Sequence, residues 1–168
     1  MIKGERGGRL VLPPEYCKLE GPVIFLAGPI QGAPDWQSQA IAIIREIAPW
    51  INIASPRRDY FDEDCVYEEQ VDWETHYLRR AAENGLILFW LAKEAHHVCE
   101  RAYAQTSRFE LGEWKVWHEK DKVRLVVGLE EGFTNSRYIV RRLSQDCPSV
   151  PILGSLTETC IWAIKELS

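Results

Sequence analysis

Gly85-Leu86-Ile87-Leu88-Phe89-Trp90-Leu91 is the stretch of this 168-residue sequence that decides the fold. A continuous apolar run of strand length is the form expected of a strand buried on both faces. Shorter runs of the same kind occur at residues 23–27, 51–54, 123–127 and 150–153, with helical patterns between them. Such alternation predicts an α/β fold, a doubly wound, five-stranded parallel sheet with helices on both faces.

The remaining segments fit around this sheet. Helices are predicted from Asp35 as N-cap to residue 47, over about 68–83, around Glu110, over 135–143, and from Ser155 as N-cap to residue 167. Residues 1–20 read as an extended arm with at most a short edge strand at 10–12, because two prolines follow. Residues 21–168 are expected to form a single domain.

Composition excludes several classes of protein. The apolar fraction of 46% is that of a globular domain, and a net charge of −5 with intermixed signs gives no signature of nucleic-acid binding. No apolar run approaches the ~20 residues that span a bilayer, and the N-terminal residues lack a signal-peptide core, so no membrane partner is expected. Five widely spaced cysteines without a CxxC pair favour reduced thiols and a cytoplasmic location.

A ligand site is expected at one edge of the predicted sheet. In open parallel sheets, ligands bind beyond the carboxyl ends of the strands. That rule brings together the segments that follow the strands, residues 28–36, 55–61, 91–106 and 128–135. Glu110 should lie one turn into a helix that starts from this edge.

Glu110 is the first candidate for chemistry. On a helix, Thr106, Glu110, Trp114 and Trp117 fall on one face. An unpaired carboxylate among aromatic side chains is costly, so the Glu110 pKa is expected to rise. Gly112 costs roughly 1 kcal/mol against Ala in a helix interior, and we expect something to approach the backbone closely there. The alternative is a partly exposed Glu110 whose stem packs on Trp114.

A second carboxylate falls on an inward helix face. Glu74 lies on the same side of the predicted helix as its apolar stripe, whereas Asp72, His76 and Arg79 face elsewhere. The stripe consists of Val71, Thr75, Leu78, Ala81 and Ala82. Paired carboxylates in dry surroundings are how glycosyl transfer is usually performed. The competing interpretation is that Glu74 or Glu110 forms a structural ion pair with Arg57, Arg58 or Arg108.

The loop at residues 28–32, Gly-Pro-Ile-Gln-Gly, lets a backbone approach a ligand after the first long strand. It is neither GxGxxG nor a Walker loop, so no nucleotide cofactor is expected. Trp36, Tyr60 and Phe61 are candidates to stack on a planar base. His96, His97 and Cys99 are metal-ligating types without a second pair at a credible spacing, so no metal site is predicted.

Four motifs together resemble one family. Residues 25–30, Val71-Asp72-Trp73-Glu74, residues 86–91 and Arg108-Phe109-Glu110-Leu111-Gly112-Glu113 are similar to the nucleoside 2-deoxyribosyltransferase superfamily, in its deoxyribosyltransferase-like branch. The resemblance covers about residues 23–143, and the Glu-Leu-Gly helix is its most specific part. It implies a flavodoxin-like fold and a Glu nucleophile at Glu110.

The resemblance also assigns residues around the substrate. It implies that Gly28, Pro29, Ile30 and Gln31 border the substrate, and that Asn135 reaches a neighbouring subunit's site at the sugar 5′ end, hence a homo-oligomer. The family also has an acidic residue on the helix before the third strand. Register places this position at Tyr77, whereas the motif at residues 71–74 places it at Asp72 or Glu74. The inward-facing side of the predicted helix favours Glu74. The family's second acid, six positions before the nucleophile, is here Ala104, which leaves the base-handling step open. Gln31 and Ala33 are neutral where related nucleotide N-hydrolases have a basic, serine-containing loop, which counts against a 5′-phosphate.

The expected function is cleavage of the N-glycosidic bond of a 2′-deoxynucleoside through Glu110 and transfer of the deoxyribosyl group to another base. Its partners would be a small-molecule nucleoside and a free base. Three alternatives stay open: a nucleoside or nucleotide N-glycosidase in which water is the acceptor, a TIR-like NAD glycohydrolase, and a non-catalytic nucleotide-binding module.

Overall fold

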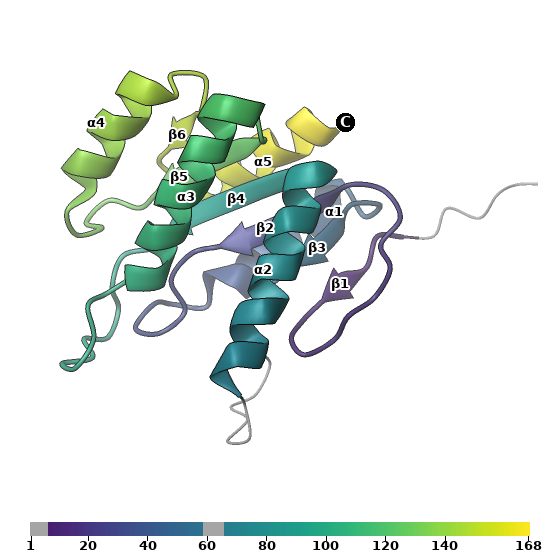
Figure 1. Cartoon of the computed structure of the whole chain (residues 1–168), viewed down its shortest axis with the longest axis horizontal. Helices are drawn as coiled ribbons and strands as arrows, with labels where there is room; N and C mark the ends of the chain where they lie inside the picture. The colour runs from purple at the N-terminus through teal and green to yellow at the C-terminus, as the bar shows by residue number, and fades with distance from the viewer. Residues whose placement is uncertain (1–6, 59–65) are drawn as a thin grey trace, which may run out of the picture.

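The computed structural model describes residues 7–58 and 66–168, which form a parallel α/β sandwich (Figure 1). Within these residues the strands are β1 (Leu10–Val11), β2 (Val23–Ala27), β3 (Asn52–Ala54), β4 (Gly85–Leu91), β5 (Leu125–Leu129) and β6 (Ile152–Leu153). The helices are α1 (Trp36–Ile47), α2 (Tyr67–Glu83), α3 (Gln105–Asp121), α4 (Ser136–Asp146) and α5 (Leu156–Leu167). The strand order is β1-β3-β2-β4-β5-β6 and every neighbouring pair is parallel, which confirms the predicted doubly wound, flavodoxin-like class.

The described sheet has six strands, not the five predicted. The additional strand is β1, whose Leu10 and Val11 pair in parallel with Ile53 and Ala54 of β3. The two prolines do stop this strand after two residues, but its backbone still pairs with the sheet: the Ser55 N–H donates to Val11 O at 3.1 Å. Part of the predicted arm is therefore an edge of the sheet.

The prediction for β5 was wrong by two residues. The strand covers Leu125–Leu129 because its register with β4 pairs Ile87 with Leu125 and Leu91 with Leu129. Gly128, expected to begin a loop, lies inside this strand. A Cβ atom there would lie 2.3 Å from the Trp90 ring and 2.5 Å from Thr159 Oγ1, so a glycine lets strand, ring and helix α5 pack closely.

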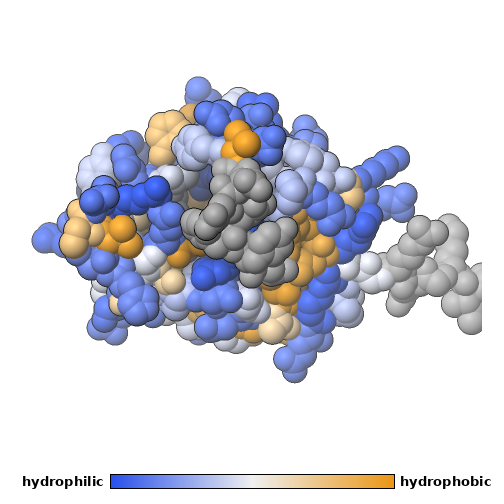
Figure 2. Space-filling view, turned by 90° about the horizontal axis from the view of Figure 1, so that it is seen from below, coloured by the Kyte–Doolittle hydropathy of each residue, from blue (hydrophilic) through white to orange (hydrophobic). Residues whose placement is uncertain are grey.

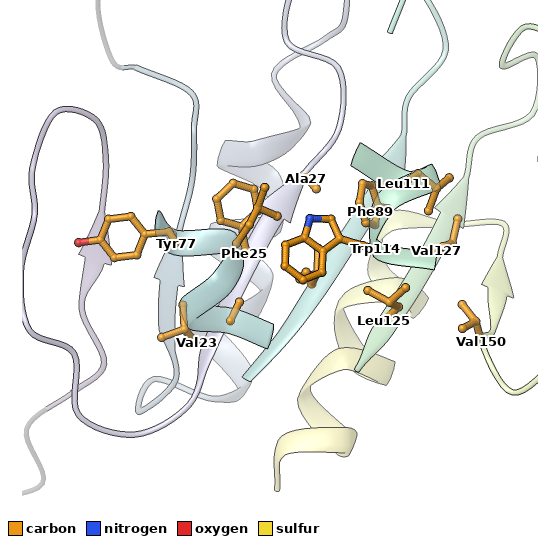
Figure 3. Packing of buried hydrophobic residues seen from close by; sticks show 14 of the residues in the cluster. Val23, Phe25, Ala27, Tyr77, Phe89, Leu111, Trp114, Leu125, Val127 and Val150 are labelled. Carbon is orange, nitrogen blue, oxygen red and sulfur yellow. The ribbon is translucent and has the colours of Figure 1, made fainter. Parts of the chain in front are cut away.

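Strand side chains alternate between two cores, one on each face of the sheet. Val23, Phe25 and Phe89 point toward α2, α3 and α4, where they pack with Tyr77, Trp114 and Leu111 among others (Figure 3). Ile24, Leu26 and Leu88 point toward α1 and α5. All seven residues of β4 are buried, as the sequence predicts for a strand covered on both faces.

The predicted helix starts are confirmed where a side chain caps them. Asp35 accepts from the Ser38 N–H at 3.1 Å, and Ser155 accepts from the Glu158 N–H at 3.2 Å. Among the described residues, no helix has the length and apolar character needed to cross a membrane.

The buried face of α2 differs from the predicted stripe. It consists of Trp73, Tyr77, Leu78 and Ala81, whereas Val71 is 38% exposed. The N-terminal segment is the reason, because it covers this face: Trp73 Nε1 donates to Glu15 O at 2.7 Å, and the Cys17 N–H donates to the Tyr77 hydroxyl at 2.9 Å. The face that α2 buries is thus set partly by a segment far away in sequence.

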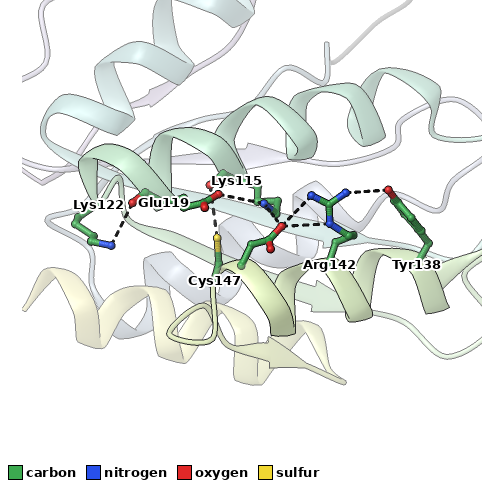
Figure 4. A network of polar contacts seen from close by, with 7 residues as sticks. Lys115, Glu119, Lys122, Tyr138, Arg142 and Cys147 are labelled. Carbon is green, nitrogen blue, oxygen red and sulfur yellow. Dashed lines mark hydrogen bonds and ion pairs between the residues drawn. The ribbon is translucent and has the colours of Figure 1, made fainter.

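A buried cation joins α3 to α4 (Figure 4). Lys115 is 8% exposed, and its Nζ lies 2.6 Å from Asp146 Oδ2, which also pairs with Arg142 at 2.9 Å. The Cys147 thiol donates to Lys115 O at 3.6 Å. Since a buried charge needs a partner, this network fixes how α3 is held against α4.

Gly85→Ala is expected to destabilise the fold by about 1–3 kcal/mol through overpacking. A Cβ atom on Gly85 would lie 2.0 Å from Val23 O of β2, and this backbone oxygen cannot move without disturbing the sheet. Urea unfolding followed by circular dichroism measures the change.

Gly112→Ala is the matched control. Gly112 is exposed, and among the described residues nothing lies within 4 Å of a Cβ atom placed there. The prediction that another segment approaches the backbone of Gly112 is therefore wrong for the described part of the chain. Alanine should stabilise α3 by up to about 1 kcal/mol. Equal destabilisation by both substitutions would contradict this account of the packing.

Candidate active site

A cleft of about 1250 Å³ opens at the carboxyl ends of β2, β3 and β4. The chain leaves β2 toward β3 on one side, while β4 lies on its other side, so this is the switch point at which doubly wound sheets bind ligands. Its walls include residues 28–31, 55–58 and parts of 94–107. Three of the four predicted segments therefore meet here, and the fourth, 128–135, does not line this cleft. Seen from the end at which α2 begins, the surface is mostly hydrophilic with separate hydrophobic patches (Figure 2).

Glu110 lines this cleft from the second turn of α3 and is partly buried. Ser107, Leu111 and Trp114 hold the helix against the sheet. The predicted aromatic face is only half correct, because Trp117 is 46% exposed. Burial, followed by the charges of Glu74 and Glu113, raises the pKa of Glu110 to about 8, as expected for a carboxyl group with costly ionisation.

Glu74 lines the same cleft from α2. Its Oε1 accepts from Gln70 Nε2 at 2.8 Å. Burial raises the pKa of Glu74, and the Gln70 hydrogen bond acts in the opposite direction. The structure thus brings the two predicted carboxyl groups into one cleft, from two different helices.

The three arginines proposed as structural partners are engaged elsewhere. Arg57 pairs with Asp35 at 3.3 Å, and Arg58 donates to Gln70 Oε1 at 3.0 Å. Arg108 donates to Thr134 O and lies 4.4 Å from the Phe133 ring centroid. Within residues 7–58 and 66–168, no cation forms an ion pair with Glu74 or Glu110. In this part of the chain, therefore, no paired cation offsets the repulsion between the two carboxylates.

Several predicted site residues lie outside the cleft walls. Asp72 is exposed, and Tyr77 is buried with its hydroxyl on the Cys17 backbone. Trp36 is 1% exposed and donates from Nε1 to Pro29 O at 2.9 Å, so it shapes the first loop from behind. Of Asp72, Glu74 and Tyr77, only Glu74 lines the cleft. Tyr60 and Phe61 lie outside the described residues.

The first loop, residues 28–32, enters the cleft through Gly28, Pro29, Ile30 and Gln31. Gly28 has φ 154°, and a Cβ atom on it would lie 2.3 Å from Trp90 O and 2.7 Å from the Trp36 ring. This close packing presses the loop onto the end of β4. Gln31 accepts from Arg101 at the opposite rim.

Asn135 lies beside a second, smaller hollow of about 540 Å³, together with Arg108 and Thr134. Its φ of 56° is left-handed, a conformation that Asn adopts more easily than most residues. Its side chain makes no capping hydrogen bond to α4. Asn135 thus has a local backbone role, and it does not line the cleft of Glu110 in its own chain.

Sequence reasoning missed several polar residues of the cleft, among them Gln70, Gln37 and Ser55. Gln70 is one turn before Glu74 on α2, and the i,i+4 spacing of helix neighbours would have shown the pair. Gln37 is 1% exposed and accepts from Arg57 at 3.2 Å. Ser55 is 1% exposed, and its Oγ has no hydrogen-bond partner in the described part of the chain. No sequence pattern marks Gln37 or Ser55, because their burial comes from the packing of β3 and α1.

The exposed His96, His97 and Cys99 follow β4 at the rim. His97 Nδ1 lies 3.1 Å from Glu94 Oε1. In the described ranges, no three or more His, Cys, Asp or Glu side chains are grouped so that they could hold a metal ion.

Fold and cleft define a parallel α/β protein with two carboxyl groups at the ligand edge of its sheet. A family model described as "Nucleoside 2-deoxyribosyltransferase like" matches residues 21–133, more than half of the chain. The chain belongs to this family. No curated protein matches the sequence at a significant level.

Glu110→Gln should remove a pH-dependent loss of stability. The folded-state pKa of about 8 lies above the usual 4.5, so the folded protein holds a proton that the unfolded chain has lost. Stability therefore falls as pH rises from about 4.5 to about 8, and the full loss is present above that range. The variant's melting temperature should exceed that of the wild type at pH 8.5 and match it near pH 4. An equal difference at both pH values would contradict the burial of this group.

Proposed function

We propose that this protein is a nucleoside 2-deoxyribosyltransferase-like enzyme, which cleaves the N-glycosidic bond of a 2′-deoxynucleoside and transfers the deoxyribosyl group to another base. One observation carries the proposal: Glu74 and Glu110, from adjacent helices, line one cleft at the ligand edge, and no cation pairs with either in the described residues. Family membership supports the same reaction. The cleft exceeds the roughly 300–1,000 Å³ of typical small-molecule sites, which leaves room for a nucleoside and an acceptor base.

In the first step, Glu110 attacks C1′ of the bound deoxynucleoside. A bond forms between a Glu110 carboxylate oxygen and C1′, and the C1′–N bond breaks with its electron pair going to the base. The departing base needs a proton. Glu110 holds one below about pH 8, and in this mechanism it passes that proton to Glu74, which delivers it to the leaving nitrogen.

In the second step, the incoming base attacks C1′ of the glycosyl ester and the ester bond breaks. The base loses its proton to Glu74, and Glu110 is released as a carboxylate. Return of the proton from Glu74 to Glu110 restores the starting state. Two displacements at one carbon retain the configuration of the sugar. A missing 2′-hydroxyl makes the oxocarbenium-like transition state easier to reach, so a 2-deoxy sugar is the expected substrate.

The mechanism requires one proton on the pair of carboxyl groups. The pH profile of kcat/KM should therefore be bell-shaped, with its alkaline limb near pH 8, where Glu110 loses its proton in the free protein.

Glu110→Gln is expected to abolish base exchange, by at least about a thousandfold if the covalent step is lost, while the chain stays folded. Deoxyadenosine incubated with free cytosine, and deoxycytidine with free adenine, followed by chromatography of the products, measure the exchange. Asp121→Asn, an exposed carboxylate at the far end of the same helix, is the control and should retain full activity. Exchange by Glu110→Gln near the wild-type rate would reject the nucleophile assignment.

The same assay separates the alternatives. Release of free base that does not depend on an added acceptor base identifies a glycosidase, and release of nicotinamide from NAD identifies a NAD glycohydrolase. If the protein binds nucleosides but the wild type turns over none of these substrates, the site is a binding module.

We further propose that the active form is a homo-oligomer in which Asn135 reaches the cleft of a neighbouring subunit. The observation that favours this is the position of Asn135 outside the cleft of its own chain, with a side chain that caps nothing. Asn135→Gly keeps the left-handed backbone and removes only the side chain. It should raise KM for the nucleoside without changing stability or the mass measured by light scattering. A fully active monomer would overturn this proposal.

A further inference from the structure

Gln70 of α2 contacts three groups at the wall of the cleft. Its Nε2 donates to Glu74 Oε1 at 2.8 Å and to Pro56 O at 3.1 Å, and its Oε1 accepts from Arg58 Nε at 3.0 Å. Pro56 and Arg58 belong to the segment after β3, so the amide connects that segment to the helix that carries Glu74. No step of the proposed reaction uses Gln70 directly.

These contacts leave the Gln70 amide a single orientation. A guanidinium group only donates hydrogen bonds and a carbonyl oxygen only accepts them. If the amide nitrogen and oxygen were exchanged, the amide N–H groups would face the N–H of Arg58, donor against donor. The amide oxygen would then face Pro56 O and the Glu74 carboxylate, acceptor against acceptor. The Nε2 group is therefore always presented to the Glu74 carboxyl group, and it carries one hydrogen for Pro56 and one for Glu74.

We propose that Gln70 is a positioning residue, whose amide, oriented by Arg58 and Pro56, fixes the Glu74 carboxylate as a hydrogen-bond acceptor in the cleft opposite Glu110. The inference deepens the proposed function, because it rests on Glu74 as the group that handles the proton. A carboxylate that accepts from a fixed donor is favoured over its protonated form. Glu74 then ionises first, and the remaining proton of the pair stays on Glu110.

The surrounding charges agree with this order. Glu110 faces Glu74 from α3 and has the further negative charge of Glu113 on its own helix, which makes its ionisation harder. On the other side of the cleft, Arg57 is paired with Asp35, and Arg58 acts on Glu74 through Gln70. Both carboxyl groups are partly buried, and of the two only Glu74 accepts a hydrogen bond from a side chain within residues 7–58 and 66–168. Gln70 therefore favours the charge on Glu74 over the charge on Glu110.

Gln70→Met tests this, because methionine keeps the length of the side chain and lacks the donor. The acid limb of the kcat/KM profile, set by Glu74, should move to higher pH by about one unit, the size expected for losing a hydrogen bond to a charged group. Gln70→Glu keeps an acceptor for Arg58 and adds a negative charge, so it should move the limb further. Gln39→Met removes an exposed amide that, among the described residues, donates only to Asp35 O, and it should leave the profile unchanged.

A titration that needs no turnover separates this inference from the proposed function. Carbon-13 NMR of the glutamate carboxyl groups, with Glu74 assigned from Glu74→Gln, reports the midpoint of Glu74 directly. A higher midpoint in Gln70→Met supports the positioning role, even if the wild type proves inactive on every nucleoside tested. An unchanged midpoint and an unchanged acid limb, with only a lower melting temperature, would mean that Gln70 is merely structural and would overturn the inference.

Discussion

Strand β4 is buried along its whole length, and the rest of the molecule depends on covering both of its faces. A helix layer on each side removes these seven residues from water while their backbone groups pair with β2 and β5. Right-handed crossovers then place β3 on one side of β2 and β4 on the other. The cleft at the ends of these strands is a consequence of that topology.

Two partly buried carboxyl groups share this cleft, and the cost of ionising both of them is the property on which its chemistry depends. Burial and the Glu74 charge together raise the pKa of Glu110 to about 8, so the protein accepts a loss of stability at neutral and alkaline pH. Such perturbed carboxyl groups are common at catalytic centres, and structural ion pairs are the usual alternative explanation. Here the three nearby arginines interact with other groups: Arg57 with Asp35, Arg58 with Gln70, and Arg108 with Thr134 O and the face of the Phe133 ring, which favours the catalytic interpretation.

Sequence patterns located the main elements because each depends on local physics. Periodicity predicts the apolar strands at 23–27 and 85–91 and the helices α2 and α3. Capping predicts the helix starts at Asp35 and Ser155. Errors arose where partners distant in sequence decide the outcome. The N-terminal segment buries Trp73 and Tyr77 of α2 and leaves Val71 exposed, and pairing with β4 moves β5 by two residues.

The sequence alone determined the class of fold, the inward direction of Glu74 and Glu110, and the family resemblance, since helix and strand periodicity fix which side chains share a face. Only the tertiary structure decided which candidates meet. It placed Glu74 in the cleft and Asp72, Tyr77 and Trp36 outside its walls, and it added Gln70, Gln37 and Ser55. The physical reason is that burial and hydrogen bonding of a polar side chain depend on the elements packed against it, and these are fixed by strand order and not by local sequence.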